Sequence, residues 1–192
     1  MVNSYGLELV RQLKICLEQN DLVIAAIDGP SGAGKTELAK WLKRKFDANV
    51  FHMDDFFLQP HQRTEARLKE VGGNIDYERF KGEVLDRLAA DHPFAYQIYD
   101  CRQQKLTDWV QVSPKRLNIV EGVYSMHPTL IDRYNFKIFL AVDRETQLER
   151  IRRRSGEQLL QRYITEWIPL EERYFQTYNL GEKADFTITT TP

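Results

Sequence analysis

The feature that most constrains this chain is a glycine-rich turn at residues 29–36, Gly-Pro-Ser-Gly-Ala-Gly-Lys-Thr. It fits the complete pattern GxxxxGK[ST], which binds the phosphates of nucleotides. Glycines let the backbone turn sharply, so that several N–H groups face phosphate oxygens at the start of a helix. Lys35 supplies a positive charge for the β- and γ-phosphates, and Thr36 supplies a hydroxyl for Mg²⁺. The residues expected to bind the nucleotide are Gly29, Ser31, Gly32, Ala33, Gly34, Lys35 and Thr36.

The segments on either side of this turn favour a strand–loop–helix unit. Residues 22–27 (LVIAAI) are wholly apolar, as expected of a parallel strand that is buried on both faces. After the turn, apolar residues recur at helical spacing from Leu38 to Phe46, with basic residues between them. A glycine-rich turn that carried Lys-Thr by chance would not be expected to have both flanks, so we interpret it as a phosphate-binding loop.

Length and charge narrow the class of protein. The chain of 192 residues fits one α/β domain, and we expect residues 1–192 to form a single unit. Its 27 basic and 28 acidic residues give a net charge of −1, which argues against bulk binding of nucleic acid or of an anionic membrane. The 2 cysteines are too few for a disulfide framework and favour a reducing cytoplasm. The apolar stretches all fall short of the ~20 residues that span a bilayer.

Further apolar runs predict the rest of a parallel sheet. The additional strands are expected at residues 49–53, 117–120, 136–142 and 185–189. Helices are expected at residues 4–19 and 76–90, from residue 144, and at residues 157–179. Pro169 is expected to kink or break the last of these helices, and residues 94–112 predict a β-hairpin. Strands joined by helical crossovers give a doubly wound α/β sheet, into which the hairpin is inserted.

Acidic residues follow two of the predicted strands. Asp54 and Asp55 come after the strand at 49–53, and Glu121 follows the strand at 117–120. Ligands of open parallel sheets bind beyond the carboxyl ends of the strands. A carboxylate at this edge is placed to accept a proton from an attacking hydroxyl, or to hold Mg²⁺ or its water shell. The structural alternatives are a solvated Asp-Asp turn and an acid that caps a turn.

For other candidate site residues, a purely structural role is an alternative to a functional one. Asp76 is placed to cap the helix at 76–90, or to contact a ligand from the helix entrance. Tyr99 in the hairpin is placed to touch a substrate or to form an ordinary sheet edge. The basic run that includes Arg150 and Arg154 is either a solvated helix face or part of a flap that closes over a triphosphate.

The ordered set of motifs resembles the uridine kinase-like branch of the P-loop kinases. That branch includes uridine–cytidine kinases, nicotinamide riboside kinases, bacterial pantothenate kinase and phosphoribulokinase. The motifs occur in the order GPSGAGKT, HMDDFF, GNIDYERF, YDCRQQK, IVEGVYS, an arginine-rich helix and KADFTI, and they span nearly the whole chain. The resemblance implies the three-layer P-loop NTPase fold, with a five-stranded parallel sheet of order 2-3-1-4-5 and a lid at about residues 150–162. It also implies ATP and Mg²⁺ as cofactors and a small hydroxyl-bearing substrate.

The resemblance further implies roles for individual residues. The residues expected to act in catalysis are the general base Asp54, Lys35, and the lid arginines Arg150 and Arg154. The residues expected to bind the acceptor are Asp54, Phe57 beside the substrate, Asp76 at the ribose hydroxyls, and Tyr99 in the nucleoside pocket. The residues expected to hold Mg²⁺ are Thr36 and Glu121.

The acceptor expected from the resemblance is the 5′-hydroxyl of a nucleoside such as uridine or cytidine. The chain departs from uridine–cytidine kinases at Cys101 and Gln104, where those enzymes have an aromatic residue and a His that reads the pyrimidine ring. Nicotinamide riboside or pantothenate is therefore an alternative acceptor. A different class, a nucleotide-binding regulator with slow hydrolysis, also remains open, although the sequence has no Asn-Lys-x-Asp guanine reader. Relatives form dimers or tetramers, so a homo-oligomer is open as well.

Overall fold

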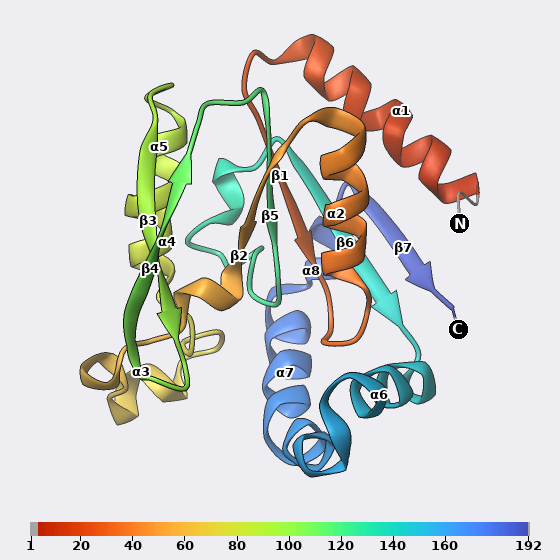
Figure 1. Cartoon of the computed structure of the whole chain (residues 1–192). Helices are drawn as coiled ribbons and strands as arrows, with labels where there is room; N and C mark the ends of the chain where they lie inside the picture. Colours follow the sequence, from red (N-terminus) through yellow and green to blue (C-terminus); the bar gives the residue numbers. More distant parts are fainter. Residues whose placement is uncertain (1–3, 192) are drawn as a thin grey trace.

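The computed structural model describes residues 4–191, and its centre is a parallel sheet (Figure 1). Within this range the sheet has five strands, in the order β2-β5-β1-β6-β7. Their bounds are Val23–Asp28 (β1), Asn49–His52 (β2), Leu117–Glu121 (β5), Phe136–Val142 (β6) and Phe186–Thr190 (β7). Numbered along the chain without the hairpin strands, this order is 2-3-1-4-5, so the predicted α/β fold is confirmed.

Helices connect these strands and cover the sheet. Their bounds are Ser4–Gln19 (α1), Lys35–Phe46 (α2), Glu65–Lys69 (α3), Tyr77–Phe80 (α4), Asp86–Leu88 (α5), Arg144–Arg162 (α6), Ile168–Tyr178 (α7) and Leu180–Lys183 (α8). Single turns of 3₁₀ or π type lie at Met53–Phe56, Pro60–Gln62, Lys81–Leu85, Ile131–Arg133 and Tyr163–Trp167. Across residues 4–191, every helix is too short or too polar to cross a membrane.

The central strand β1 is apolar from Val23 to Ile27 because both of its faces are covered. Successive side chains of a strand point to opposite faces of a sheet. Ala25 therefore belongs to the same buried cluster as Leu13 of α1 and Leu42 of α2. Its neighbour Ala26 belongs to the second cluster, on the other face, with Phe80 of α4. This two-sided burial accounts for the uninterrupted apolar run that precedes the glycine-rich turn.

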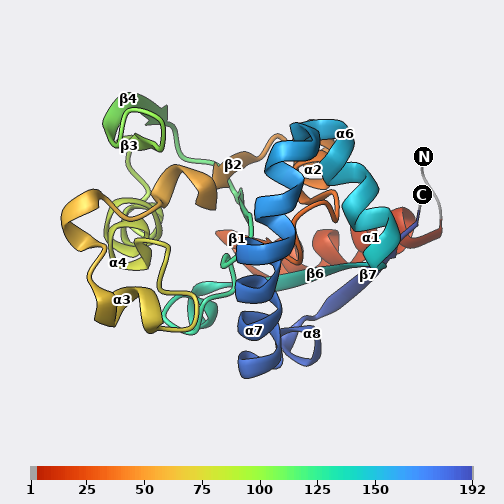
Figure 2. The same ribbon diagram turned by 90° about the horizontal axis from the view of Figure 1, so that it is seen from below.

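The predicted hairpin is present as a sheet of its own. β3 (Phe94–Asp100) pairs antiparallel with β4 (Lys105–Val112). Tyr96 of β3 is buried against Phe51 and Phe56, with ring centroids 5.9 and 5.3 Å apart. These contacts fasten the hairpin to the end of β2, and both ribbon views show it beside α4, on the β2 side of the main sheet (Figures 1 and 2).

Two segments differ from the expectation from sequence. Residues 58–75, for which the sequence analysis predicted neither helix nor strand, contain short helical turns, and Thr64 caps α3 by accepting a hydrogen bond from the Arg67 N–H. The backbone breaks at Gly156 within α6, where φ is 80° and ψ is 169°, a position that the sequence analysis did not predict. At Pro169 the backbone stays helical, but the turn directly before it, Tyr163–Trp167, is of π type, with the Ile168 N–H donating to the Tyr163 carbonyl.

Candidate functional site

The glycine-rich turn connects the carboxyl end of β1 to the start of α2. Gly29, Gly32 and Gly34 have φ angles of +138°, +83° and +97°, which L-residues with a side chain rarely adopt. A Cβ on Gly29 would lie 2.2 Å from the carbonyl oxygen of Leu140 in β6. Ala33 is fully buried beneath the turn. The predicted nucleotide-binding residues therefore share one tight turn at a helix N-terminus, the geometry that presents backbone N–H groups to an anion.

A buried carboxylate that the sequence analysis did not single out supports this turn from below. Asp28, the last residue of β1, accepts hydrogen bonds from the N–H groups of Gly29 (2.7 Å) and Met126 (2.8 Å) and from the hydroxyl of Tyr174 (2.9 Å). Complete burial raises the pKa of Asp28 to about 6, although these three donors and Lys35 oppose the shift. The signal in the sequence was an aspartate closing an otherwise apolar strand.

Lys35 is folded back onto the turn from which it projects. Its ammonium group donates to the carbonyl oxygens of Gly29 (2.7 Å) and Pro30 (3.0 Å). Burial lowers the pKa of Lys35, while the negative charges of Asp28 and Glu171 act in the opposite direction. A cation with this many acidic neighbours and only carbonyl partners is well placed to exchange them for phosphate oxygens.

Thr36 and Glu121 meet at the carboxyl edge of the sheet, as the prediction of a shared metal site requires. The Thr36 hydroxyl donates to Oε1 of Glu121 at 3.1 Å, and Nδ1 of His52 lies 2.5 Å from the same oxygen. The hydrogen bond to Glu121 raises the pKa of His52. In residues 4–191, His, Cys, Asp and Glu side chains form no cluster of three suited to a metal. A hydroxyl and a single carboxylate nevertheless fit Mg²⁺, which prefers oxygen ligands and takes much of its shell from phosphates and water.

Asp54 stands in the turn that follows β2, facing this group. Its carboxyl is accessible to solvent but has protein on several sides, and this partial desolvation, together with the charge of Glu121, raises its pKa. The positive charges of Lys35, His52 and Arg154 oppose that shift. These mutual effects come from side chains of separate elements that lie close together at this edge of the sheet.

Asp55 has a different environment from its neighbour. Its side chain is half-buried and accepts a hydrogen bond from the Tyr96 hydroxyl of the hairpin at 3.2 Å. Its backbone carbonyl accepts from the Arg79 guanidinium at 2.7 Å. The structure thus separates the Asp-Asp pair into one carboxylate at the site and one that attaches the hairpin.

Asp76 is the N-cap of α4, which is one of the two roles predicted for it. Its carboxylate is buried, accepts from the Arg79 N–H at 3.0 Å, and accepts from the Gln62 side chain at 2.8 Å. Its backbone N–H donates to Phe56 at 2.7 Å, which brings it beside the turn that carries Asp54. Its carboxylate is therefore near the site but occupied by structural partners.

The other acceptor-side candidates lie in the hairpin and in the segment after Asp54. Tyr99 of β3 is buried, whereas Cys101 at the hairpin turn is exposed. Partial burial and then the charge of Asp54 raise the pKa of the Cys101 thiol, so this end of the hairpin lies toward Asp54. Phe57 is half-buried and pairs through its backbone with Ile75.

The two predicted lid arginines have separate positions. Arg150 donates to the carbonyl of Gly32 (3.3 Å) and to the hydroxyl of Thr190 (3.0 Å), so it ties α6 to the back of the turn and to the end of β7. Arg154 donates to the Tyr163 hydroxyl at 2.9 Å, and its charge acts on Asp54. Both arginines precede the Gly156 break, but only Arg154 contacts the helical segment that follows it, so the assignment of both to a lid stays a prediction.

α7 contributes two residues to which the sequence analysis assigned no role beyond the predicted helix at residues 157–179. Glu171 is buried and accepts hydrogen bonds from both the N–H and the hydroxyl of Ser31, and Tyr174 reaches Asp28. From α6, the Gln147 amide donates to the Ser31 carbonyl at 3.0 Å. The view from below shows α6 and α7 crossing this end of the sheet, opposite the hairpin (Figure 2).

Comparison with known proteins finds kinases that are similar to this chain. No family model matches the chain. Among curated proteins, uridine-cytidine kinase C from Dictyostelium discoideum is 24% identical over 111 residues, which make up 57% of this chain and 24% of that protein. The chain thus spans about a quarter of the length of this relative.

Solved structures match over more of the chain. A protein described as a possible uridine kinase from Bacillus stearothermophilus has a TM-score of 0.67 and 21% identity, covering 94% of this chain and 99% of that one. A candidate fructose transport system kinase from Silicibacter sp. has a TM-score of 0.72 and 20% identity, with coverages of 94% and 97%. This chain has the fold of the uridine kinase-like P-loop kinases. D-glycerate 3-kinase from Cryptococcus neoformans, with a TM-score of 0.65 and 15% identity over 88% of each chain, shares that kinase fold.

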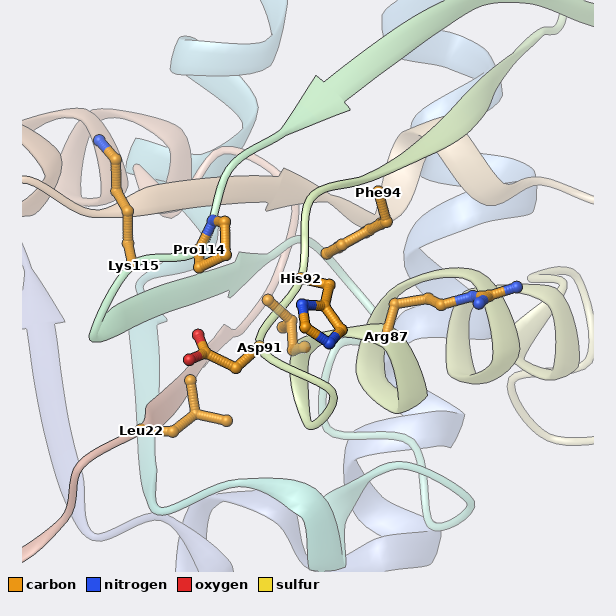
Figure 3. Close-up of a pocket in the computed structure, with 8 residues that line it drawn as sticks. Leu22, Arg87, Asp91, His92, Phe94, Pro114 and Lys115 are labelled. Atoms are coloured by element: carbon orange, nitrogen blue, oxygen red, sulfur yellow. The ribbon is translucent and has the colours of Figure 1, made fainter.

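A small hollow in this kinase fold lies away from the site. It has a free volume of about 10 Å³ and is lined by residues that include Leu22, Arg87, His92 and Lys115 (Figure 3). Leu22 precedes β1 and Lys115 precedes β5, so the hollow lies at the amino ends of the strands. The glycine-rich turn lies at their carboxyl ends, where ligands of such sheets bind.

Proposed function

We propose that this protein is an ATP- and Mg²⁺-dependent kinase that transfers the γ-phosphoryl group to a primary hydroxyl of a small molecule. The observation that carries the proposal is the convergence of Lys35, Glu121, Asp54 and Arg154 at the carboxyl edge of the sheet. One cation emerges from the phosphate-binding turn, one carboxylate contacts the Thr36 hydroxyl, and a second carboxylate faces them from another strand. Phosphoryl transfer needs this combination of positioning and charge compensation.

Each residue has a defined task in this proposal. Asp54 accepts the proton of the attacking hydroxyl, and its raised pKa makes it a better base than a fully solvated aspartate. Lys35 and Arg154 stabilise the negative charge spread over the transferring group. Thr36 and Glu121 hold Mg²⁺, which when bound supplies charge neutralisation at the phosphate oxygens.

The acceptor we favour is a nucleoside such as uridine or cytidine, bound near Asp54, Phe57, Asp76 and Tyr99. Support comes from the uridine-cytidine kinase relative in sequence and from the uridine kinase-like fold. Nicotinamide riboside and pantothenate are alternatives, and the fructose and glycerate names of two fold neighbours add sugars and hydroxy acids to the panel. The structure has both cysteines free, which is in keeping with our proposal of a cytoplasmic protein.

A coupled assay of ADP release tests this function. Purified protein with Mg²⁺ and ATP is given uridine, cytidine, nicotinamide riboside, pantothenate, fructose, glycerate or no acceptor. We expect at least one hydroxyl compound to accelerate ADP release, and Lys35→Ala to abolish the stimulated rate. A slow rate that no acceptor changes would contradict the kinase proposal and favour the alternative of a nucleotide-binding regulator.

A further inference from the structure

The first turn of α7 carries a carboxylate that is hydrogen-bonded into the phosphate-binding turn. Oε2 of Glu171 accepts from the backbone N–H of Ser31 at 2.9 Å, and Oε1 accepts from the Ser31 hydroxyl at 2.5 Å. The Glu171 residue is only 4% exposed. Backbone N–H groups of such a turn are the donors that bind phosphate oxygens. An anion that belongs to the protein therefore occupies part of this donor set.

The same carboxylate also acts on the cation of the site. After Asp28, Glu171 is the acidic neighbour with the largest effect on the pKa of Lys35. Burial raises the pKa of Glu171, and the positive charge of Lys35 acts against this rise. Lys35 itself donates to the carbonyls of Gly29 and Pro30. An incoming phosphate would thus meet a like charge beside the ammonium group that it needs.

Other contacts keep the surrounding elements in place independently of Glu171. The Tyr174 hydroxyl donates to Asp28 at 2.9 Å, which fixes α7 to the end of β1. The Gln147 amide donates to the backbone carbonyl oxygen of Ser31 at 3.0 Å, which fixes α6 to the turn. These contacts do not use the Ser31 N–H, so they would remain if the Glu171 side chain left Ser31.

We propose that Glu171 is an internal competitor of the nucleotide phosphates, a residue that lowers the affinity of the turn for ATP and ADP and leaves Ser31 when a phosphate binds. The inference rests on the proposed function only in that the turn binds nucleotide phosphates. According to this inference, Glu171, which lies 140 positions from Ser31 in the sequence, helps to determine the affinity for nucleotides. The alternative is that Glu171 stabilises the phosphate-binding turn and stays bound to Ser31 when a nucleotide binds.

Calorimetric titration of the whole chain with Mg·ADP, Mg·ATP and adenosine separates the two roles. Glu171→Gln keeps a carbonyl oxygen that accepts from Ser31 but removes the negative charge. We expect this variant to bind ADP and ATP about tenfold more tightly than the wild type, and to bind adenosine with the same affinity. A tenfold gain corresponds to about one charge-assisted hydrogen bond, the contact between Glu171 and Ser31 that the wild type must break when a phosphate binds. The control is Glu172→Gln, because Glu172 lies in the same turn, is exposed, and pairs at 3.4 Å with Arg144. The control should bind all three ligands as the wild type does.

The outcomes are distinct. Unchanged or weaker binding of ADP and ATP by Glu171→Gln would indicate that Glu171 stabilises the turn, and would overturn the inference. An equal gain in affinity for adenosine would also overturn it. Failure of both wild type and variant to bind ADP would overturn the inference and the proposed function together. Tighter ADP binding without stimulation by any acceptor would uphold the inference while refuting the kinase proposal. Should Glu171→Gln not fold, Glu171→Asp withdraws the carboxylate by one methylene, and a gain confined to the phosphorylated ligands is again expected.

Discussion

The carboxyl group of Asp28 should make the stability of this protein depend on pH. Complete burial raises its pKa from the ordinary 3.8 to about 6. The folded state therefore binds this proton more tightly than the unfolded chain, so the contribution to stability is fully present below about pH 4 and is lost as the pH rises through about 6. Since each pKa unit is worth about 1.4 kcal/mol, the loss amounts to about 3 kcal/mol.

Asp28→Asn removes the titrating group and provides the test. The free energy of unfolding in urea is measured for both proteins at intervals from pH 4 to pH 8. We expect wild type to lose about 3 kcal/mol relative to the variant between pH 4 and pH 7. An Asn amide cannot accept all three hydrogen bonds, so the variant also carries a penalty that does not vary with pH. Parallel pH profiles of the two proteins would refute the assignment of a raised pKa to Asp28.

The remaining predictions concern the same region. Tyr174→Phe removes a hydroxyl that donates to buried Asp28, so urea unfolding should show a loss of about 2 kcal/mol, the usual value for a hydrogen bond to a charged group; no loss would mean that the hydroxyl is not needed there. Asp54→Asn should lower kcat by about 10²–10⁴ while calorimetry shows unchanged ADP affinity, and full activity in this variant would eliminate Asp54 as the base. Gly29→Ala places a Cβ 2.2 Å from a backbone oxygen of β6, so thermal unfolding should reveal a loss of about 3 kcal/mol or more, and a wild-type Tm would contradict the packing of the turn.

The sheet could be predicted because its signals are local. Five short apolar runs mark its strands, and the glycine-rich turn identifies the strand whose carboxyl end is used. The rule that ligands bind at this edge then led to Thr36 and Glu121, which the structure brings into contact. Pro169 indicated the irregular π turn that precedes it, but the backbone break at Gly156 could not be predicted, because a glycine inside a polar helix does not by itself reveal a positive φ.

The support of the site could not be predicted from local patterns. Asp28 reads as the end of a strand, and Glu171 and Tyr174 read as members of an aromatic-rich packing helix. Their roles depend on partners 140 and 146 residues away in the chain, and helical spacing does not encode such pairings. Arg150 illustrates the same point, because a basic run does not reveal which arginine meets a carbonyl and which faces a carboxylate.

The distance in sequence between the turn and its supports has a consequence for how the site comes into being. The phosphate-binding motif lies at residues 29–36, but α7, which contacts both Ser31 and Asp28, begins only at Ile168. Bringing such remote segments together is slow compared with forming local structure. Nucleotide binding should therefore arise late in folding, after the C-terminal helices have docked. A chain truncated before residue 168 would retain the whole motif in its sequence while lacking the contacts that shape it.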